Sequence, residues 1–284
     1  MGVGMSFGAR LADAIARRGP FCVGIDPHPR LLTEWGLPAD ATGLDRFART
    51  AVEALASDIA VLKPQSAFFE AYGSAGIAVL ERVITQSRDA GALVLLDVKR
   101  GDIGSTMAAY AAAYLADGAP LAADAVTLSP YLGFGSLEPA LDLAARTGRG
   151  VFVLAMTSNP EGSGVQRAVL PGAADGRSVA QSMVDGAAQR NRDATPMGSV
   201  GVVIGATVTD TSLRFANLNG PILAPGYGAQ GGTPADLRAV FGPELARVLP
   251  SSSRDVLRHG PDQRLLRDAA LRARDVVTTL LASP

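Results

Sequence analysis

Eight short apolar segments alternate with helical segments along the chain, and this alternation is the feature that most limits its possible folds. The predicted strands cover 21–25, 59–62, a run starting at 93, 125–128, 151–154, 200–204, 222–224 and 246–249. The predicted helices cover 6–18, 43–55, 77–84, 106–115, 137–145, 178–190, 211–217, a short segment after 233, and 263–281. Short buried strands that alternate with helices are typical of an α/β (β/α)8 barrel.

Residues 1–284 are therefore expected to form one barrel domain. An open, doubly wound sheet is the alternative arrangement of the same elements. That fold would carry a Gly-x-Gly-x-x-Gly motif after its first strand, and the motif is absent here.

Composition excludes several classes of function. Hydrophobic residues make up 48% of the chain, enough for a large core, and the net charge of −1 offers no basic field for nucleic acid. A single cysteine, Cys22, cannot form an internal disulfide, and with two histidines it argues against a zinc site. The sequence has no signal-peptide pattern and no apolar run long enough to span a membrane. We expect a soluble, cytoplasmic protein.

The stretch 93–106 combines a buried strand with a cluster of charges. Its apolar start, Leu93–Leu96, predicts a strand of a parallel sheet, and two-residue periodicity places Asp97 and Lys99 on one face of it. Asp102 follows in the next turn. Placing these charges together at a strand end costs desolvation energy unless they pair, so the cluster is either catalytic or a structural ion pair.

Polar residues also follow most of the other predicted strands. Each could be a turn residue, a helix cap or a solvated loop residue. In a barrel, however, the carboxyl ends of all strands meet at the face where active sites form. The polar residues at these ends are Asp26, Lys63, Asp97 with Lys99, Ser129, Ser158, Gln230 and Arg254.

The ends of the seventh and eighth strands suggest a phosphate site. The loop 225–232 contains four glycines, among them Gly231, which let the backbone approach an anion closely. Gln230 and Arg254 add side-chain donors. Barrel enzymes often bind phosphate at these two strand ends, whereas a glycine-rich tight turn without a ligand is the alternative. The stretch 159–177 is too long for an ordinary loop and is expected to be a lid or disordered.

Several motifs together resemble the orotidine 5′-phosphate decarboxylase family. The pattern Asp97-x-Lys99-x-x-Asp102-Ile103-x-x-Thr106 looks like its signature, and segments 24–27, 62–70, 156–160 and 225–232 extend the likeness over most of the chain. The Asp-Val-Lys-Arg-Gly-Asp form is similar to the longer, divergent branch of the family. The chain departs from it at the eighth strand, where Ser252-Ser253-Arg254 replaces the commoner Gly-Arg-Ser.

The resemblance implies decarboxylation of orotidine 5′-monophosphate to uridine 5′-monophosphate, the last step of de novo pyrimidine synthesis, without metal or organic cofactor. It implies that Lys99 protonates C6, and that Asp97 lies near the substrate carboxylate and also holds Lys99. Lys63 would complete the network and touch the ribose. Asp102 and Thr106 would reach the site of a neighbouring subunit, which implies a homodimer. The implied substrate-binding residues are Asp26 for the ribose, Thr106, Ser158 for the pyrimidine, and Gln230, Gly231 and Arg254 for the phosphate.

Two alternatives remain open on the sequence alone. One is a sugar-phosphate decarboxylase or aldol-type synthase of the same barrel superfamily, which shares the Asp-x-Lys-x-x-Asp core but uses Mg²⁺. The other is a nucleotide-binding protein without catalysis on the same scaffold. The segments 63–65 and 156–158 favour the nucleotide enzyme over the first alternative, and the complete Asp and Lys set argues against the second.

Overall fold

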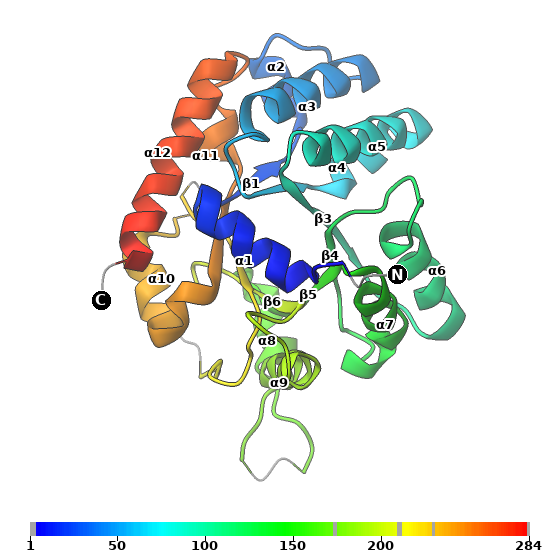
Figure 1. Ribbon diagram of the computed structural model, residues 1–284, viewed down its shortest axis with the longest axis vertical. Coiled ribbons are helices and arrows are strands. Elements are labelled where there is room, and N and C mark those ends of the chain that lie inside the picture. Colours follow the sequence, from blue (N-terminus) through cyan, green and yellow to red (C-terminus); the bar gives the residue numbers. More distant parts are fainter. Residues whose placement is uncertain (1–3, 173–174, 209–211, 229–230, 283–284) are drawn as a thin grey trace.

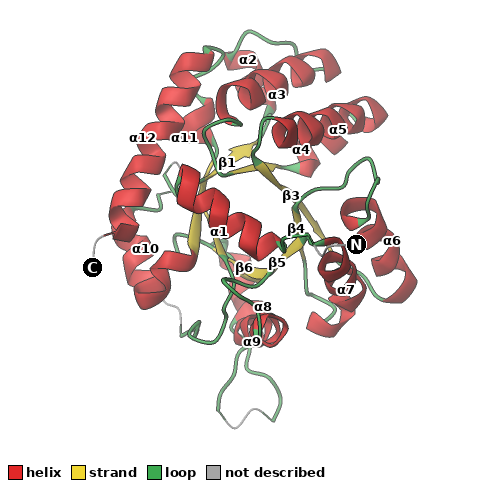
Figure 2. Cartoon of the chain, in the orientation of Figure 1, coloured by secondary structure: helices red, strands yellow, loops and turns green. Residues whose placement is uncertain are grey.

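Eight parallel strands close into a barrel in chain order, surrounded by helices (Figures 1 and 2). The structure is a computed structural model that describes residues 4–172, 175–208, 212–228 and 231–282. Each strand pairs with the next in parallel, and β8 pairs with β1, so the predicted (β/α)8 barrel is confirmed. The strands are β1 (Cys22–Ile25), β2 (Val61–Pro64), β3 (Leu93–Arg100), β4 (Ala125–Leu128), β5 (Gly150–Met156), β6 (Val200–Ile204), β7 (Ile222–Pro225) and β8 (Val248–Ser252).

The helices cover the outside of the barrel, and several begin where the sequence offers a cap. Ser6 and Ser178 accept main-chain N–H bonds at the starts of α1 and α9, and Asp40 does so for α3. The helices are α1 (Phe7–Arg18), α2 (Pro29–Glu34), α3 (Ala41–Leu55), α4 (Ser66–Glu70), α5 (Gly73–Asp89), α6 (Gly104–Leu115), α7 (Glu138–Thr147), α8 (Ser163–Gln166), α9 (Val179–Asn191), α10 (Pro234–Phe241), α11 (Arg254–Leu257) and α12 (Gln263–Ala282).

The helix expected over 211–217 is wrong. In the described part of that stretch, residues 212–217 form a loop that ends in a turn. Its main chain pairs with a side chain of α9: Arg214 N donates to Gln181 Oε1, and Gln181 Nε2 donates to Arg214 O. Leu213 and Phe215 are buried without helical periodicity. A side-chain amide thus satisfies backbone groups that a helix would otherwise have paired.

Two other boundaries also differ from expectation. Strand β8 starts at Val248 rather than 246, because a 3₁₀ helix (Gly242–Arg247) precedes it, and it extends through Ser252. The described part of 159–177 is not the disordered segment offered as one alternative: it contains a 3₁₀ turn (Pro160–Gly162), α8 and a bridge between Val169 and Ser178. Its use as a lid stays a prediction.

Helix α1 closes the amino-terminal end of the barrel. It crosses that end in Figure 1. Phe7 and Leu11 of α1 are fully buried against inward-facing residues of the strands, among them Phe152 and Leu249. A larger apolar cluster fills the space between the strands and the outer helices. The amino-terminal end of the barrel interior is therefore filled by apolar side chains. The carboxyl ends of the strands remain as the place for polar groups.

Among the described residues, no helix is both long enough and apolar enough to cross a membrane.

We expect the contact between α1 and the strands to contribute strongly to stability. Leu11→Ala removes a side chain that is 0% exposed, so the free energy of unfolding should fall by about 2–5 kcal/mol. Chemical denaturation measures the loss. The matched control is Leu265→Ala on α12, where the leucine is 42% exposed and the change should stay within about 0.5 kcal/mol. Equal losses in both variants would contradict this role of α1.

Candidate active site

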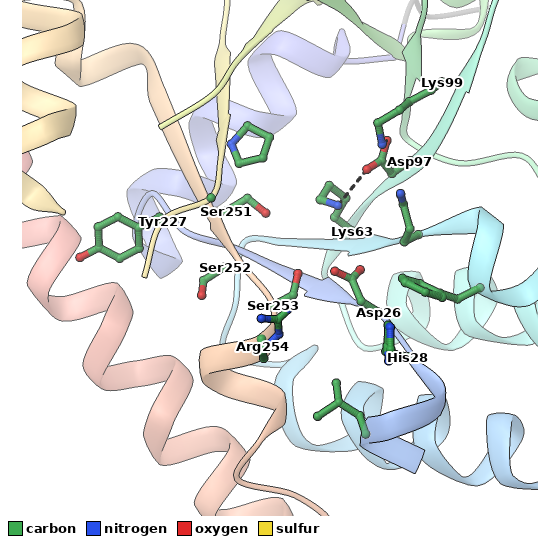
Figure 3. A pocket seen from close by; sticks show the side chains of 15 residues that line it. Asp26, His28, Lys63, Asp97, Lys99, Tyr227, Ser251, Ser252, Ser253 and Arg254 are labelled. Carbon is green, nitrogen blue, oxygen red and sulfur yellow. Dashed lines mark hydrogen bonds and ion pairs between the residues drawn. The ribbon is translucent and has the colours of Figure 1, made fainter. Parts of the chain in front are cut away.

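Two adjoining cavities open at the carboxyl ends of the strands. The larger has a volume of about 330 Å³ and is lined mainly by residues at or after the carboxyl ends of β1, β2, β3, β7 and β8. The smaller, of about 150 Å³, is bounded by apolar side chains such as Leu154, Val203 and Leu223. Asp97 and Lys99 line both cavities, so the pair lies where the two spaces meet. Figure 3 shows the larger cavity with its labelled side chains.

Asp97 is the centre of a buried hydrogen-bonded network. The Nζ of Lys63 lies 3.0 Å from Asp97 Oδ2, and the Nζ of Lys99 lies 2.6 Å from Oδ1. Thr127 Oγ1 donates to the same Oδ1 at 2.7 Å. Lys63 and Asp97 are buried, whereas 44% of the Lys99 side chain is exposed to the cavity and solvent. Lys99 is therefore the cation of the network that is more accessible to a ligand.

Gln65 completes the shell around the carboxylate. With its amide nitrogen turned toward Asp97, it donates to Oδ2 at 2.6 Å and to the main-chain oxygen at 3.1 Å. Its oxygen then accepts from Lys99 Nζ at 3.3 Å. A carboxylate has about four lone-pair positions, and here each oxygen receives one ammonium and one neutral donor. Asp97 is thus held in one orientation.

The network fixes the charge of its members. Burial alone would raise the pKa of Asp97, but the ammonium groups of Lys63 and Lys99 outweigh it and hold that pKa well below its usual range. Burial alone would lower the pKa of Lys63, but the carboxylates of Asp97 and Asp26 outweigh it and raise that pKa. At neutral pH Asp97 is therefore a carboxylate and Lys63 is an ammonium group.

The side of the larger cavity formed by the ends of β1 and β8 presents polar atoms that lack a hydrogen-bond partner among the described residues. Asp26 Oδ1 and Ser252 Oγ are buried, have no hydrogen-bond partner in the described part of the chain, and belong to residues that line this cavity. Arg254 lines it as well, at the first position of α11. Buried polar atoms without partners are costly unless a ligand or water satisfies them. This side is suited to hydroxyl and anionic groups.

The structure brings together most of the predicted site residues. Asp26, Lys63 and Arg254 line the larger cavity with Asp97 and Lys99, and Ser158 lines the smaller one. The other predicted residues are not at the cavities. Asp102 and Thr106 line neither: Asp102 Oδ1 accepts from Ile103 N at 2.8 Å, and Thr106 is exposed on α6. Gly231 and Ser129 line neither, and Gln230 lies outside the described residues.

Sequence reasoning missed several residues of the site. His28 is exposed but also lines the cavity and packs edge-on against Phe68, with ring centroids 5.7 Å apart. Thr127 and Tyr227 line the cavities and were not singled out. A signal for Thr127 was present: it is the polar residue inside the apolar strand Ala125–Leu128.

Lysine usage offers a further signal that the sequence contained. Lys63 and Lys99 are the only two lysines of the chain, and the other 24 of its 26 Lys and Arg residues are arginine. Arginine serves as a permanent cation because its guanidinium does not lose its proton in proteins, whereas an ammonium can. Lysine is thus confined to the one place where the structure gathers a titratable cation and a carboxylate.

The fold and the site together define a (β/α)8-barrel enzyme whose charged groups converge at the carboxyl ends of its strands. Residues 19–267 match the model of the orotidine 5′-phosphate decarboxylase / HUMPS family, and the chain belongs to this family.

Curated proteins named orotidine 5′-phosphate decarboxylase match nearly the whole chain. An orotidine 5′-phosphate decarboxylase of Salinispora arenicola is 63% identical over 265 residues, covering 93% of this chain and 94% of that protein. One of Streptomyces coelicolor is 59% identical over 278 residues, covering 98% and 99%. Two solved structures are also similar to this chain over nearly its whole length. One from Streptomyces avermitilis, provisionally named an orotidine 5′-phosphate decarboxylase, has a TM-score of 0.95 at 56% identity and covers 100% of this chain and 98% of its own. The OMP decarboxylase of Leishmania donovani has a TM-score of 0.75 at 28% identity, with 98% and 100% covered.

The lowered pKa of Asp97 predicts how the network contributes to stability at different pH values. Because the folded pKa lies below the unfolded value of about 3.9, the contribution is full above that value and is lost as the pH falls toward the folded pKa. Asp97→Asn should lower the free energy of unfolding by about 3–5 kcal/mol at pH 7, because it leaves buried Lys63 uncompensated.

The difference between wild type and Asp97→Asn should stay constant from about pH 8 to 5 and shrink below about pH 4. Denaturant unfolding across that range measures it. Asp193→Asn, at an exposed turn position, is the control and should leave stability nearly unchanged. A wild-type advantage that grew as the pH fell would contradict the assignment.

Proposed function

We infer that this protein is an orotidine 5′-monophosphate decarboxylase, which releases CO2 and forms uridine 5′-monophosphate in de novo pyrimidine synthesis. One observation carries the inference: the Lys99 ammonium, 2.6 Å from Asp97, lies where a polar cavity meets an apolar one. The names of relatives 59–63% identical over nearly the full chain point to the same activity.

The two cavities suggest how the substrate binds. We propose that Arg254 contacts the phosphate and that Asp26 binds a ribose hydroxyl, because both line the polar cavity and Asp26 Oδ1 has no hydrogen-bond partner among the described residues. The pyrimidine would enter the smaller cavity, where Ser158 can hydrogen-bond it. The bond to be broken then lies beside Asp97 and Lys99, where the two cavities meet.

The chemistry follows from where charge develops. When the bond between C6 and the carboxylate breaks, its electron pair stays in an orbital of C6 that lies in the plane of the ring, so the ring π-system cannot delocalise it. The Lys99 ammonium is a fixed countercharge for this carbon and donates the proton that forms the new C6–H bond, while CO2 leaves. Lys99 is then neutral and recovers a proton from solvent. Arginine could not perform this step because it does not give up its proton.

Asp97 and Lys63 keep the acid in place. Asp97 stays ionised at neutral pH, because its pKa is held low by the two ammonium groups, so it orients Lys99 rather than donating a proton. Its negative charge would also repel the substrate carboxylate, and that repulsion ends when neutral CO2 forms. Lys63 balances the charge of Asp97 through its contact with Oδ2, and it remains charged itself because its pKa is raised.

The expected activity can be measured directly. Purified protein mixed with orotidine 5′-monophosphate should change its ultraviolet absorbance as uridine 5′-monophosphate forms, with full rate in EDTA. Lys99→Ala should lower kcat by at least about 10⁴-fold, because the acid and the countercharge disappear together. Arg192→Ala removes an exposed cation from the end of α9 and should leave kcat unchanged.

Other outcomes of these assays would contradict the proposal. Absence of turnover by wild type would overturn the function, and binding of uridine 5′-monophosphate without turnover would instead favour a nucleotide-binding protein. Comparable turnover by Lys99→Ala would overturn the role of that residue. Activity that EDTA abolishes would favour the metal-dependent enzymes of the superfamily.

We further propose that two copies of the chain pair through the loops that follow β3 and β4. These loops touch, since Ser129 N donates to Arg100 O at 2.8 Å. They present apolar side chains that are unusually exposed: Ile103 at 62%, Tyr131 at 81% and Leu132 at 53%. Neighbouring exposed apolar residues mark an interaction surface. Asp102 adjoins this surface and would enter the partner's cavity from it, in a cytoplasmic homodimer.

Mixing two inactive variants tests the pairing. If each site takes Lys99 from one chain and Asp102 from the other, Lys99→Ala and Asp102→Ala are each inactive. Refolded together, they should regain up to about a quarter of wild-type activity, because half of the dimers are mixed and each mixed dimer has one intact site. The assay is turnover before and after mixing. No recovery, or a fully active monomer at micromolar concentration, would contradict the shared site.

A further inference from the structure

The hydroxyl of Thr127 is a part of the site that the proposed reaction does not use. Thr127 lies on β4, is 1% exposed, and lines the smaller cavity beside Asp97 and Lys99. Its neighbours Val126 and Leu128 face the outer apolar cluster, so Thr127 points into the barrel. A hydroxyl buried among apolar walls is costly unless both its proton and its lone pairs are used.

Both capacities of this hydroxyl are used within the network. Oγ1 donates its proton to Asp97 Oδ1 at 2.7 Å and accepts the main-chain N–H of Lys99 at 3.0 Å. One oxygen atom therefore joins the carboxylate to the backbone of the residue that bears the ammonium. Gln65 also contacts Asp97 and Lys99, but it binds the flexible end of the Lys99 side chain rather than its backbone.

The backbone of β3 needs this bond. The pairing of β3 with β4 is regular at Leu96 opposite Val126, and it resumes at Arg100 opposite Leu128. Between these pairs β3 has three residues, Asp97 to Lys99, opposite Thr127 alone, so the strand bulges. Lys99 has a φ of 47°, in the left-handed region that costs an ordinary side chain energy. The Thr127 hydroxyl accepts the Lys99 N–H within this irregular stretch.

We propose that Thr127 is a positioning residue for the decarboxylation, and this rests on the function proposed above. Its hydroxyl fixes the bulge, and the bulge sets the distance between the Lys99 ammonium, Asp97 and the reacting carbon. Without the hydroxyl, Lys99 N–H and one lone pair of Asp97 lose their partner beside a cavity that water can enter. The backbone of Lys99 then relaxes, and the ammonium leaves the position that the reaction needs.

Two substitutions separate the hydroxyl from the volume of the side chain. Thr127→Val keeps the shape and removes the hydroxyl, and Thr127→Ser keeps the hydroxyl. We expect Thr127→Val to lower kcat about 10–100-fold, the size of effect that misplacing a reacting group by about 1 Å produces. KM should change less than about threefold, because the contacts to the ribose and the phosphate remain. Thr127→Ser should restore most of the lost kcat.

Thr85→Val is the matched control. Thr85 is an exposed residue of α5 whose hydroxyl donates to Glu81 O, and its replacement should leave kcat and KM unchanged. If Thr127→Val lowered only the melting temperature and kept its kcat, the hydroxyl would be structural and the proposal would be overturned. A Thr127→Ser variant as slow as Thr127→Val would overturn it too.

A second measurement does not depend on turnover. Because the chain has only two lysines, [13Cε]-lysine labelling gives two side-chain resonances, and the one missing from Lys99→Arg belongs to Lys99. Thr127→Val should shift and broaden the Lys99 resonance, and Thr127→Ser should leave it near its wild-type position. An unmoved resonance in Thr127→Val would refute the positioning role. Loss of the proposed function would instead appear as no turnover by wild type, with the resonances still reporting on Thr127.

Discussion

The carboxylate of Asp97, bound by two ammonium groups inside the barrel, is the interaction on which the site depends. A lone carboxylate at this depth would take up a proton, and a lone ammonium would lose one, because burial disfavours both charges. Lys63 and Lys99 keep Asp97 ionised, and the carboxylates of Asp97 and Asp26 keep Lys63 charged. Asp97 and Lys63 therefore keep their opposite charges at neutral pH. The network then supplies Lys99 with a fixed partner and leaves its exposed part free for a ligand.

The barrel makes this arrangement possible because it separates apolar from polar groups along its axis. Helix α1 and the inward side chains near it, such as Phe7 and Phe152, exclude water from the amino-terminal end. At the other end, neighbouring strands β2, β3 and β4 each deliver one part of the network, namely Lys63, Asp97 with Lys99, and Thr127. Closure of the barrel by β8 on β1 brings Ser252 and Arg254 to the side where Asp26 lies. Residues far apart in the sequence thus reach one cavity through strand order alone.

This is why the sequence could predict the barrel and much of the site. A buried parallel strand is an apolar run, and the residue after it lies at the barrel rim, so Asp26, Lys63, Asp97 and Arg254 could be assigned to one face from their positions. The errors arose where side chains replace backbone pairing. Gln181 satisfies the loop around Arg214, where a helix was expected, and Thr127 accepts the N–H of Lys99 at the bulge of β3. Such contacts join residues 28 or 33 positions apart and leave no local periodicity to detect.

The bulge also changes what the spacing of Asp97 and Lys99 means. In a regular strand, alternate residues share a face because the backbone is extended, and that rule correctly predicted that the two side chains would meet. In the structure, the contact between the two side chains depends on a left-handed backbone at Lys99 and on a shift in strand register. The alternation of residues in the sequence predicts neither feature. Strain of this kind persists only where surrounding contacts over-determine the conformation. The short bond between Lys99 and Asp97, together with the hydroxyl of Thr127, supplies those contacts, so the same interactions that orient the ammonium also hold the backbone that presents it.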